Sequence, residues 1–278
     1  MLPKIDTLLV CVDVREDSED KREFLSISTP DIRSNKPYGI HDQQDGKTAF
    51  FQVLIEGVIA GRAISVAAPN EISLSLSSSR KSVNSARLLR RKISERAVEK
   101  NTLYKEEVGD VYDMLEEMQK AIVFAYRAVE SFCNASIPDN YIYRKTGSKG
   151  IVEEYKKEQI ERWISTSEKV SAILPEILHC VSPIKEEFWS DFKKLESLRN
   201  EIIHSKSSSS SNTLSAIFSD ECETYVGSCL KLLHYFIRLD SSNQIFPMGF
   251  GESSIRAVSV PNADDYLQII SQEIAAGT

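Results

Sequence analysis

Two side chains near the end of a predicted helix have the right chemistry to act on a phosphodiester. Arg199 and His204 lie in the segment 198–206, which runs directly into five consecutive serines. An arginine is permanently cationic, and a histidine can exchange a proton near neutral pH. Together they can stabilise charge and move a proton without a metal ion. Asn200 follows the arginine and adds a hydrogen-bonding amide.

Arg199 occupies an unusual position on its predicted helix. At about 100° per residue, the helix gathers apolar side chains on one face, and Arg199 projects from the middle of that face. The apolar side chains are Phe188, Phe192, Leu195, Leu198 and Ile202. A buried charge without a partner is strongly destabilising. Arg199 must therefore find an anion, a hydrogen-bonding cluster or an opening to solvent.

The helical geometry separates Arg199 from His204. The two residues lie about 140° apart on an ideal helix, so they would not meet in a straight helix of one chain. Two arrangements would bring them into one site. Either the helix loosens at the serine loop, or a second copy of the chain completes the site. The second arrangement predicts a two-fold homodimer through the helical part of the molecule.

A second group of candidate residues lies in a predicted helix at 82–100, which is strongly basic although the whole chain is acidic. The cationic side chains that we expect to bind RNA are Arg87, Arg90, Arg91, Lys92 and Arg96. One interpretation is a solvated linker helix, which is the usual role of a run of charges. The other is an arm that binds RNA phosphates, because cationic clusters supply most of the sequence-independent affinity for nucleic acids.

The composition limits the classes of function. The chain has 278 residues, a formal charge of −7 and a pI near 5.3, so it does not coat nucleic acid over its whole surface. Five scattered cysteines without a CxxC pair or a zinc-ligand spacing predict buried thiols in a reducing cytoplasm, and we expect neither a metal nor a cofactor. No apolar run approaches the length of a membrane span, and the first residues lack a secretion signal. We therefore expect a soluble cytoplasmic protein.

Residues 1–80 have the pattern of a small antiparallel β domain. Apolar and β-branched residues come in short runs, and turn-forming residues separate them at distances that suit hairpins. The predicted strands are 7–14, 23–29, 48–56, 62–67 and 71–77. In the last of these, apolar side chains alternate with serines almost without interruption.

Residues 106–239 change to helical periodicity, with apolar residues at spacings of three and four. The predicted helices are 106–136, 152–174, 183–206 and 220–238. Their short connections predict an antiparallel four-helix bundle, which makes the fold class α+β. Residues 81–105 would form the basic helical linker. The tail, 240–278, would contain a strand at 255–260 and a short helix at 264–274.

At Arg199, Asn200 and His204 the chain resembles the HEPN superfamily of four-helix ribonuclease and nucleotide-binding domains. The signature of that superfamily is an arginine, a polar residue, three variable residues and a histidine. The first predicted helix, 106–136, whose stretch 125–132 leads to Asn134 and to Ile137 and Pro138, is also similar to the opening helix of many such proteins. The resemblance covers about 106–239. It implies an RNA-cleaving domain that works without a metal, usually as a dimer whose two Arg–His pairs face each other across a cleft.

The resemblance implies a role for each residue of the motif. In RNA the 2′-hydroxyl can attack its own phosphate, so an enzyme need only move protons and stabilise charge. His204 would be the general acid or base. Arg199 would bind the phosphate and the extra negative charge of the transition state. Asn200 would hold either the imidazole or a phosphate oxygen by hydrogen bonds.

The predicted helix at 106–136 offers supporting residues. Arg127, Glu130 and Asn134 share its polar side at spacings of three and four. Glu130 is placed to pair with Arg199 in the resting state. The other interpretation of these residues is a solvated face with salt bridges.

Two classes of function remain open. The first is a metal-independent endoribonuclease, for which the resemblance suggests a toxin or an antiviral defence effector that cleaves RNA. The β domain would then be a sensor or would bind a regulatory protein or ligand. The alternative is a non-catalytic protein whose HEPN-like bundle mediates dimerisation, ligand binding or scaffolding. In that case Arg199 would pair with a carboxylate, and His204 would be a surface or capping histidine.

Overall fold

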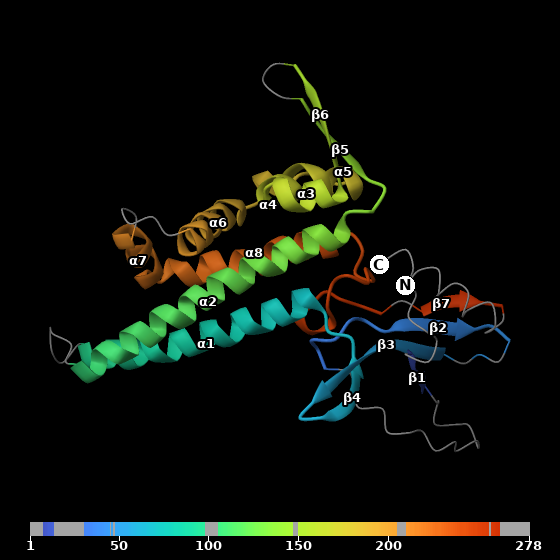
Figure 1. The fold of residues 1–278 in the computed structure, drawn as a ribbon, viewed down its shortest axis with the longest axis horizontal. Helices are drawn as coiled ribbons and strands as arrows, with labels where there is room; N and C mark the ends of the chain where they lie inside the picture. Colours follow the sequence, from blue (N-terminus) through green and yellow to red (C-terminus); the bar gives the residue numbers. More distant parts are fainter. Residues whose placement is uncertain are drawn as a thin grey trace. The chain divides into compact units, whose positions relative to one another are not determined.

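The protein is a mixed α+β structure with two compact units. The computed structural model describes residues 8–13, 31–44, 46, 48–97, 105–146, 150–204, 210–255 and 257–261. One unit consists of Met1–Ser73 and Leu239–Thr278, and the other of Leu74–Arg238. The first contains a small sheet and the second is mainly helical (Figure 1).

The sheet of the first unit is built around one long strand, β3 (Thr48–Ile59). It pairs antiparallel with β1 (Leu8–Asp13), β2 (Tyr38–Asp42) and β4 (Arg62–Ala67). β7 (Ala257–Val260) pairs parallel with β2, so the strand order is β1-β3-β2-β7, with β4 also on β3. The expectation of a purely antiparallel sheet is therefore wrong, because a strand from the far end of the chain joins it.

Several predicted strands of this unit are present. β1, β3 and β4 lie where the apolar runs placed them, and β7 falls within the strand predicted at 255–260. β2 was not predicted, because its apolar residues are few and turn-forming residues flank it. The strand predicted at 23–29 and the helix predicted at 264–274 lie outside the described residues.

A buried lysine ties the segment after residue 238 to the rest of the sheet unit. Lys36 Nζ donates hydrogen bonds to the main-chain oxygens of Ser241 (3.0 Å), Asn243 (2.7 Å) and Ser254 (3.1 Å). These bonds use all the donors of the ammonium group. Burial lowers the pKa of Lys36 to about 8, so the group is still mostly charged at pH 7. The held segment includes a short 3₁₀ turn, Met248–Phe250.

The segment 71–77, predicted as a strand, is in fact the start of helix α1 (Glu71–Ala97). Asn70 caps this helix, because its side-chain oxygen accepts a hydrogen bond from the Ser73 N–H at 2.8 Å. The serines of the alternating pattern are buried. One turn further on, Ser79 Oγ donates to the main-chain oxygen of Ala121 in α2 (Lys105–Ser136) at 2.9 Å. Small polar side chains therefore let the two helices approach closely.

Four long helices form the bundle of the second unit: α1, α2, α6 (Trp189–Ile203) and α8 (Glu221–Ile237). Figure 1 shows α1 running beside α2, and the basic residues 81–97 are the C-terminal part of α1. The most deeply buried apolar side chains of the bundle include Ile122, Val129, Phe132, Phe192, Leu195 and Leu232.

A β hairpin interrupts the predicted helical segment. β5 (Ile142–Thr146) and β6 (Val152–Lys156) pair antiparallel and project from the helices in Figure 1. Gly150, with φ of 73°, stands just before β6 in a conformation that favours glycine. The expectation of an uninterrupted bundle from 106 to 239 is therefore wrong, as is the helix predicted at 152–156.

The rest of the second predicted helix is broken into short pieces. They are α3 (Lys157–Trp163), α4 (Thr166–Glu168), a π-helical turn (Lys169–Ile173) and α5 (Leu174–Ile177). Ser165 causes one break, because its side chain caps α4 by accepting a hydrogen bond from the Glu168 N–H at 3.2 Å. Pro175 does not end the helical path but lies in the first turn of α5.

The third predicted helix begins later than expected. Pro183 starts a separate 3₁₀ turn (Pro183–Lys185), and α6 itself begins only at Trp189. An unpredicted helix, α7 (Ser210–Phe218), includes the end of the serine run. The fourth predicted helix matches α8 closely.

Candidate functional site

Arg199 lies at the edge of the bundle with an incomplete set of partners. Its side chain is 24% exposed, and its Cζ atom lies 5.0 Å from the ring centroid of Tyr126 in α2. Nη2 lies 4.0 Å from Glu130 Oε2, and Nη1 donates a hydrogen bond to Asn200 Oδ1 at 3.1 Å. The structure thus brings Arg199 and Glu130 together, but at the outer limit of an ion pair. Besides the amide oxygen of Asn200, the Tyr126 ring supports the guanidinium.

A buried carboxylate that the sequence analysis missed contacts the same tyrosine. Glu196 is 8% exposed, and its Oε1 accepts a hydrogen bond from Tyr126 Oη at 2.9 Å. Its Oε2 accepts hydrogen bonds from Ser167 Oγ, at 2.6 Å, and from Lys193 Nζ. Burial raises the pKa of Glu196, but hydrogen bonds from Lys193, Ser167 and Tyr126 outweigh it, so the pKa lies below its ordinary value. Glu196 lies three residues before Arg199 on the same helix face, and this spacing in the sequence could have identified it.

His204 stands just outside α6. It is the C-cap residue, with φ of −118° and ψ of 46°, and its backbone N–H donates to the Asn200 main-chain oxygen at 2.9 Å. Its side chain is exposed. Among the residues that the structure describes, no hydrogen bond or ion pair holds the imidazole or links it to Arg199. The helix therefore ends at the motif, and a single chain presents its arginine and its histidine separately.

The other supporting candidates on α2 have different surroundings. Asn134 Oδ1 accepts a hydrogen bond from Lys169 Nζ at 2.8 Å, and Lys169 also donates to the Glu161 main-chain oxygen at 3.0 Å. Lys169 is 1% exposed and lies in the π-helical turn, and burial lowers its pKa. Asn134 therefore supports a buried ammonium group. Arg127, in contrast, has an exposed side chain.

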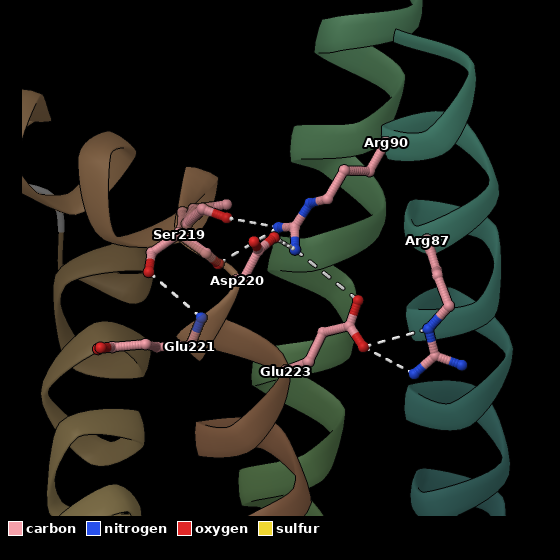
Figure 2. Close-up of polar contacts among 7 residues, drawn as sticks. Arg87, Arg90, Ser219, Asp220, Glu221 and Glu223 are labelled. Atoms are coloured by element: carbon pink, nitrogen blue, oxygen red, sulfur yellow. Dashed lines mark hydrogen bonds and ion pairs between the residues drawn. The ribbon is translucent and has the colours of Figure 1, made fainter. Parts of the chain in front are cut away.

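Arg90 holds α1 against the segment where α7 ends and α8 begins. Its Nη1 lies 2.8 Å from Asp220 Oδ1, and its Nη2 donates to the main-chain oxygens of Ile217 and Ser219, both at 3.3 Å (Figure 2). Ile217 lies in the last turn of α7, where main-chain acceptors lack helical partners, and Ser219 lies just after that helix. Arg90 therefore caps α7 and ties α1 to the start of α8.

Arg87 and Arg91 flank this contact on α1. Arg87 donates from Nε and Nη2 to Glu223 Oε2 of α8, at 3.2 and 2.6 Å, as Figure 2 shows. Arg91 is exposed, and no described side chain pairs with its guanidinium. An open pocket of about 390 Å³ is lined by Arg87, Arg90, Arg91, Ser94, Asp220 and Glu223. The pocket contains arginines that carboxylates already neutralise in part.

The last two cations of the basic segment also have acidic partners. Lys92 Nζ lies 2.7 Å from Asp110 Oδ1, and Arg96 Nη1 lies 3.4 Å from Asp110 Oδ2 in α2. Within the described part of the chain, Arg91 is thus the member of the predicted RNA-binding set that keeps an unpaired guanidinium. Much of the local positive charge connects helices of the bundle.

The thiols and the acidic side chains give no sign of a further chemical centre. Burial raises the pKa of the Cys133 thiol to about 12 and that of Cys222 to about 11, so both are unreactive at neutral pH. In the described ranges, no cluster of three or more His, Cys, Asp or Glu side chains could hold a metal ion. None of the described helices is both long enough and apolar enough to cross a membrane.

The fold and the site define an α+β protein whose helical bundle carries an Arg–Asn pair and a histidine at the end of one helix. Comparisons of the chain with models of protein families, with curated proteins and with solved structures found no match.

Proposed function

We propose that the protein is a metal-independent endoribonuclease of the HEPN type that acts as a homodimer. The observation that carries this proposal is the state of Arg199, a half-buried guanidinium whose contact with Glu130 is 4.0 Å long. A permanent cation held in this way can bind a phosphate, which offers two oxygens to the planar edge of the guanidinium. The exposed His204 follows at the end of the same helix.

The proposed reaction requires only proton transfer and charge stabilisation. The 2′-hydroxyl of RNA attacks the adjacent phosphorus, and the bond from phosphorus to the 5′-oxygen of the next nucleotide breaks. The products are a 2′,3′-cyclic phosphate and a 5′-hydroxyl. One imidazole removes the proton of the 2′-hydroxyl and a second one protonates the leaving oxygen, so the His204 side chains of two copies would act as base and acid. Arg199 stabilises the added negative charge, and Asn200 binds a phosphate oxygen or the imidazole.

The dimer is part of the proposal because one chain does not complete the site. α6 ends at Ile203, and no described contact joins His204 to Arg199. We expect a two-fold dimer through the helical bundle, in which the motif of one copy faces that of the other. Sedimentation equilibrium is the measurement, and a protein that stays monomeric at high micromolar concentration would count heavily against the dimer.

Cleavage of total RNA in the presence of a chelator tests the catalytic proposal. We expect Arg199→Ala and His204→Ala each to lower the rate by about 10²–10⁴-fold, because one removes charge stabilisation and the other proton transfer. Arg144→Ala and His41→Ala are matched controls outside the motif and should cleave like the wild type. Circular dichroism must show that all four variants are folded. The enzymatic proposal fails if His204→Ala cleaves RNA at the wild-type rate while Arg199→Ala unfolds.

The sheet unit has no catalytic part in this proposal. It would act as a sensor, or bind a regulatory protein or ligand, for an effector that cleaves cytoplasmic RNA as a toxin or in antiviral defence. The resemblance of the bundle to HEPN proteins is the support for this role. Growth arrest on expression of the wild type, absent on expression of His204→Ala, is the expected result.

A second candidate function is a non-catalytic dimerisation, ligand-binding or scaffold protein. The observation that favours it is that Arg199 already has contacts within its own chain, with the Tyr126 ring, Asn200 and Glu130. Under this alternative the purified protein would dimerise and bind its ligand, but would leave RNA intact with or without the chelator. The cleavage assay therefore separates the two functions.

A further inference from the structure

Tyr126 of α2 contacts three side chains that lie on one face of α6. Phe192, Glu196 and Arg199 follow one another at spacings of four and three, and all of them contact Tyr126. The Phe192 and Tyr126 rings are nearly parallel, at 8°, with their centroids 6.1 Å apart. Glu196 accepts the hydrogen bond from Tyr126 Oη at 2.9 Å, and the Arg199 guanidinium lies over the ring at 5.0 Å. The tyrosine is 4% exposed.

Two of these contacts, with Phe192 and Glu196, hold the tyrosine ring in place. A buried ring that stacks on Phe192 and hydrogen-bonds to Glu196 cannot rotate without losing both contacts. Glu196 is itself held by Ser167 and Lys193. A chain of contacts therefore runs from α4 and α6 through Glu196 to the phenol, and the ring forms a fixed surface at the edge of the bundle.

The ring supports Arg199 in a way that leaves its donors available. A cation–π contact uses the face of the guanidinium, whereas the N–H groups that bind phosphate lie in its plane. Among the described residues, only Nη1 has a short hydrogen bond, to Asn200, while Nη2 lies 4.0 Å from Glu130 Oε2. A free arginine side chain has about 2 kcal/mol of rotamer entropy, which it would lose on binding a phosphate. A ring that already orders the guanidinium removes part of this loss.

We propose that Tyr126 is the positioning residue of Arg199, and that the hydrogen bond to Glu196 sets the position of its ring. This inference rests on the proposed ribonuclease function and adds to it a residue outside the Arg–Asn–His motif. Tyr126 does not touch the substrate. It orients the guanidinium so that its edge faces the position of the phosphate.

The variants separate the ring from its hydroxyl. Tyr126→Leu removes the surface under Arg199, whereas Tyr126→Phe keeps that surface and removes the hydrogen bond to Glu196. Glu196→Gln keeps the shape of the acceptor and removes its charge. Tyr112→Leu is the matched control, because Tyr112 lies on the same helix and is 62% exposed. If Tyr126→Leu does not fold, Tyr126→Phe and Glu196→Gln still test the inference, because each keeps the ring, while the first removes its hydrogen bond to Glu196 and the second weakens it.

The first measurement is the order of the Arg199 Nε–H group by NMR relaxation, which does not depend on activity. We expect Arg199 to be ordered in the wild type and in Tyr112→Leu, mobile in Tyr126→Leu, and intermediate in Tyr126→Phe and Glu196→Gln. An Arg199 side chain that stays equally ordered in all these variants overturns the inference.

The second measurement is RNA cleavage. Misplacement of a catalytic group by about 1 Å can cost about 10²-fold, so Tyr126→Leu should lower kcat by about 10–100-fold with a small change in KM. A purely structural role would lower the amount of folded protein and leave kcat per folded molecule unchanged. If the wild type cleaves no RNA, the proposed function fails, and the relaxation measurement still decides whether Tyr126 orders Arg199.

Discussion

Two arginines of the helical unit are almost equally buried and yet differ in how they are held. The side chain of Arg90 is 21% exposed and that of Arg199 is 24% exposed. Arg90 has a carboxylate at 2.8 Å and two main-chain oxygens at 3.3 Å, with a second carboxylate, Glu223, at 3.8 Å. Arg199 has an aromatic face, one amide oxygen and a carboxylate at 4.0 Å.

This difference separates a structural cation from one that can bind a ligand. Arg90 directs its donors to the ends of α7 and α8, so a phosphate could reach it only by displacing groups that hold the helices together. A phosphate could bind Arg199 while displacing few existing contacts. The contact with the Tyr126 ring would remain, and the contact with Glu130 is already 4.0 Å long. Burial and charge alone do not separate these two arginines, whereas the completeness of their hydrogen bonds to the described residues does.

The largest expected difference between the two arginines is in stability. Arg90→Ala should lower the free energy of unfolding by about 1–3 kcal/mol, because it removes the donor to the main-chain oxygens of Ile217 and Ser219, which joins α1 to the end of α7. Arg199→Ala should change it by less than about 1 kcal/mol and could stabilise the bundle, since the described carboxylate that pairs with its charge, Glu130, lies 4.0 Å away. Urea denaturation measures both, with Arg91→Ala as the control that should stay within about 0.5 kcal/mol. Equal losses for Arg90 and Arg199 would remove the distinction.

Local sequence patterns predicted correctly those elements whose structure depends mainly on the burial of one of their own faces. The helix pattern of α2 and α8 and the apolar runs of β1, β3 and β4 gave correct elements, because burial of one face dominates each of them. Glu130, on the polar side of α2, was also predicted to pair with Arg199, and it lies 4.0 Å from it. The alternation at 71–77 misled, because serines that face water in a strand can equally lie buried between closely packed helices. The feature that distinguishes the helix from a strand at 71–77 is the cap by Asn70, which is a single hydrogen bond.

Long-range polar contacts account for what the sequence could not predict at the site. Tyr126 and Glu196 are 70 residues apart, and no periodicity shows that they share a hydrogen bond. Arg90 and its partners at the start of α8 are 130 residues apart, so the segment 82–100 read as solvated charge or as an RNA arm. The structural role of this segment is to bind the end of α7 through Arg90. The sequence did not predict this role, because α7 lies in a serine-rich stretch that has the composition of a loop.

Acid should destabilise the α2–α6 contact through Glu196. Its pKa in the folded protein lies below the ordinary value of 4.5, so the unfolded chain takes up the proton first as the pH falls. The stabilisation is therefore fully present above about pH 5 and is lost as the pH falls below 4.5 towards the pKa of the folded state. We expect Glu196→Gln to flatten this loss in urea denaturation between pH 6 and pH 3. The exposed Glu187→Gln should keep the wild-type slope, and an unchanged slope in Glu196→Gln would show that this carboxylate does not titrate with folding.

The smallest expected effect concerns Arg91, which tests whether the basic helix has any role in RNA binding. Its guanidinium is exposed and has no described partner, so charge reversal should not disturb the bundle as reversal of Arg90 would. If Arg91 contacts a phosphate, Arg91→Glu should weaken RNA binding by a few-fold and lower the slope of log affinity against log salt by about 1. Single-turnover cleavage at saturating protein should stay near the wild-type rate, since Arg91 offers no group for proton transfer.

Lys231→Glu, an equal change of charge on the exposed face of α8, is the control for net charge and should leave affinity and salt slope closer to the wild type. If both variants bind RNA like the wild type, the cations of α1 serve only to connect the helices, and the RNA site is confined to the end of α6.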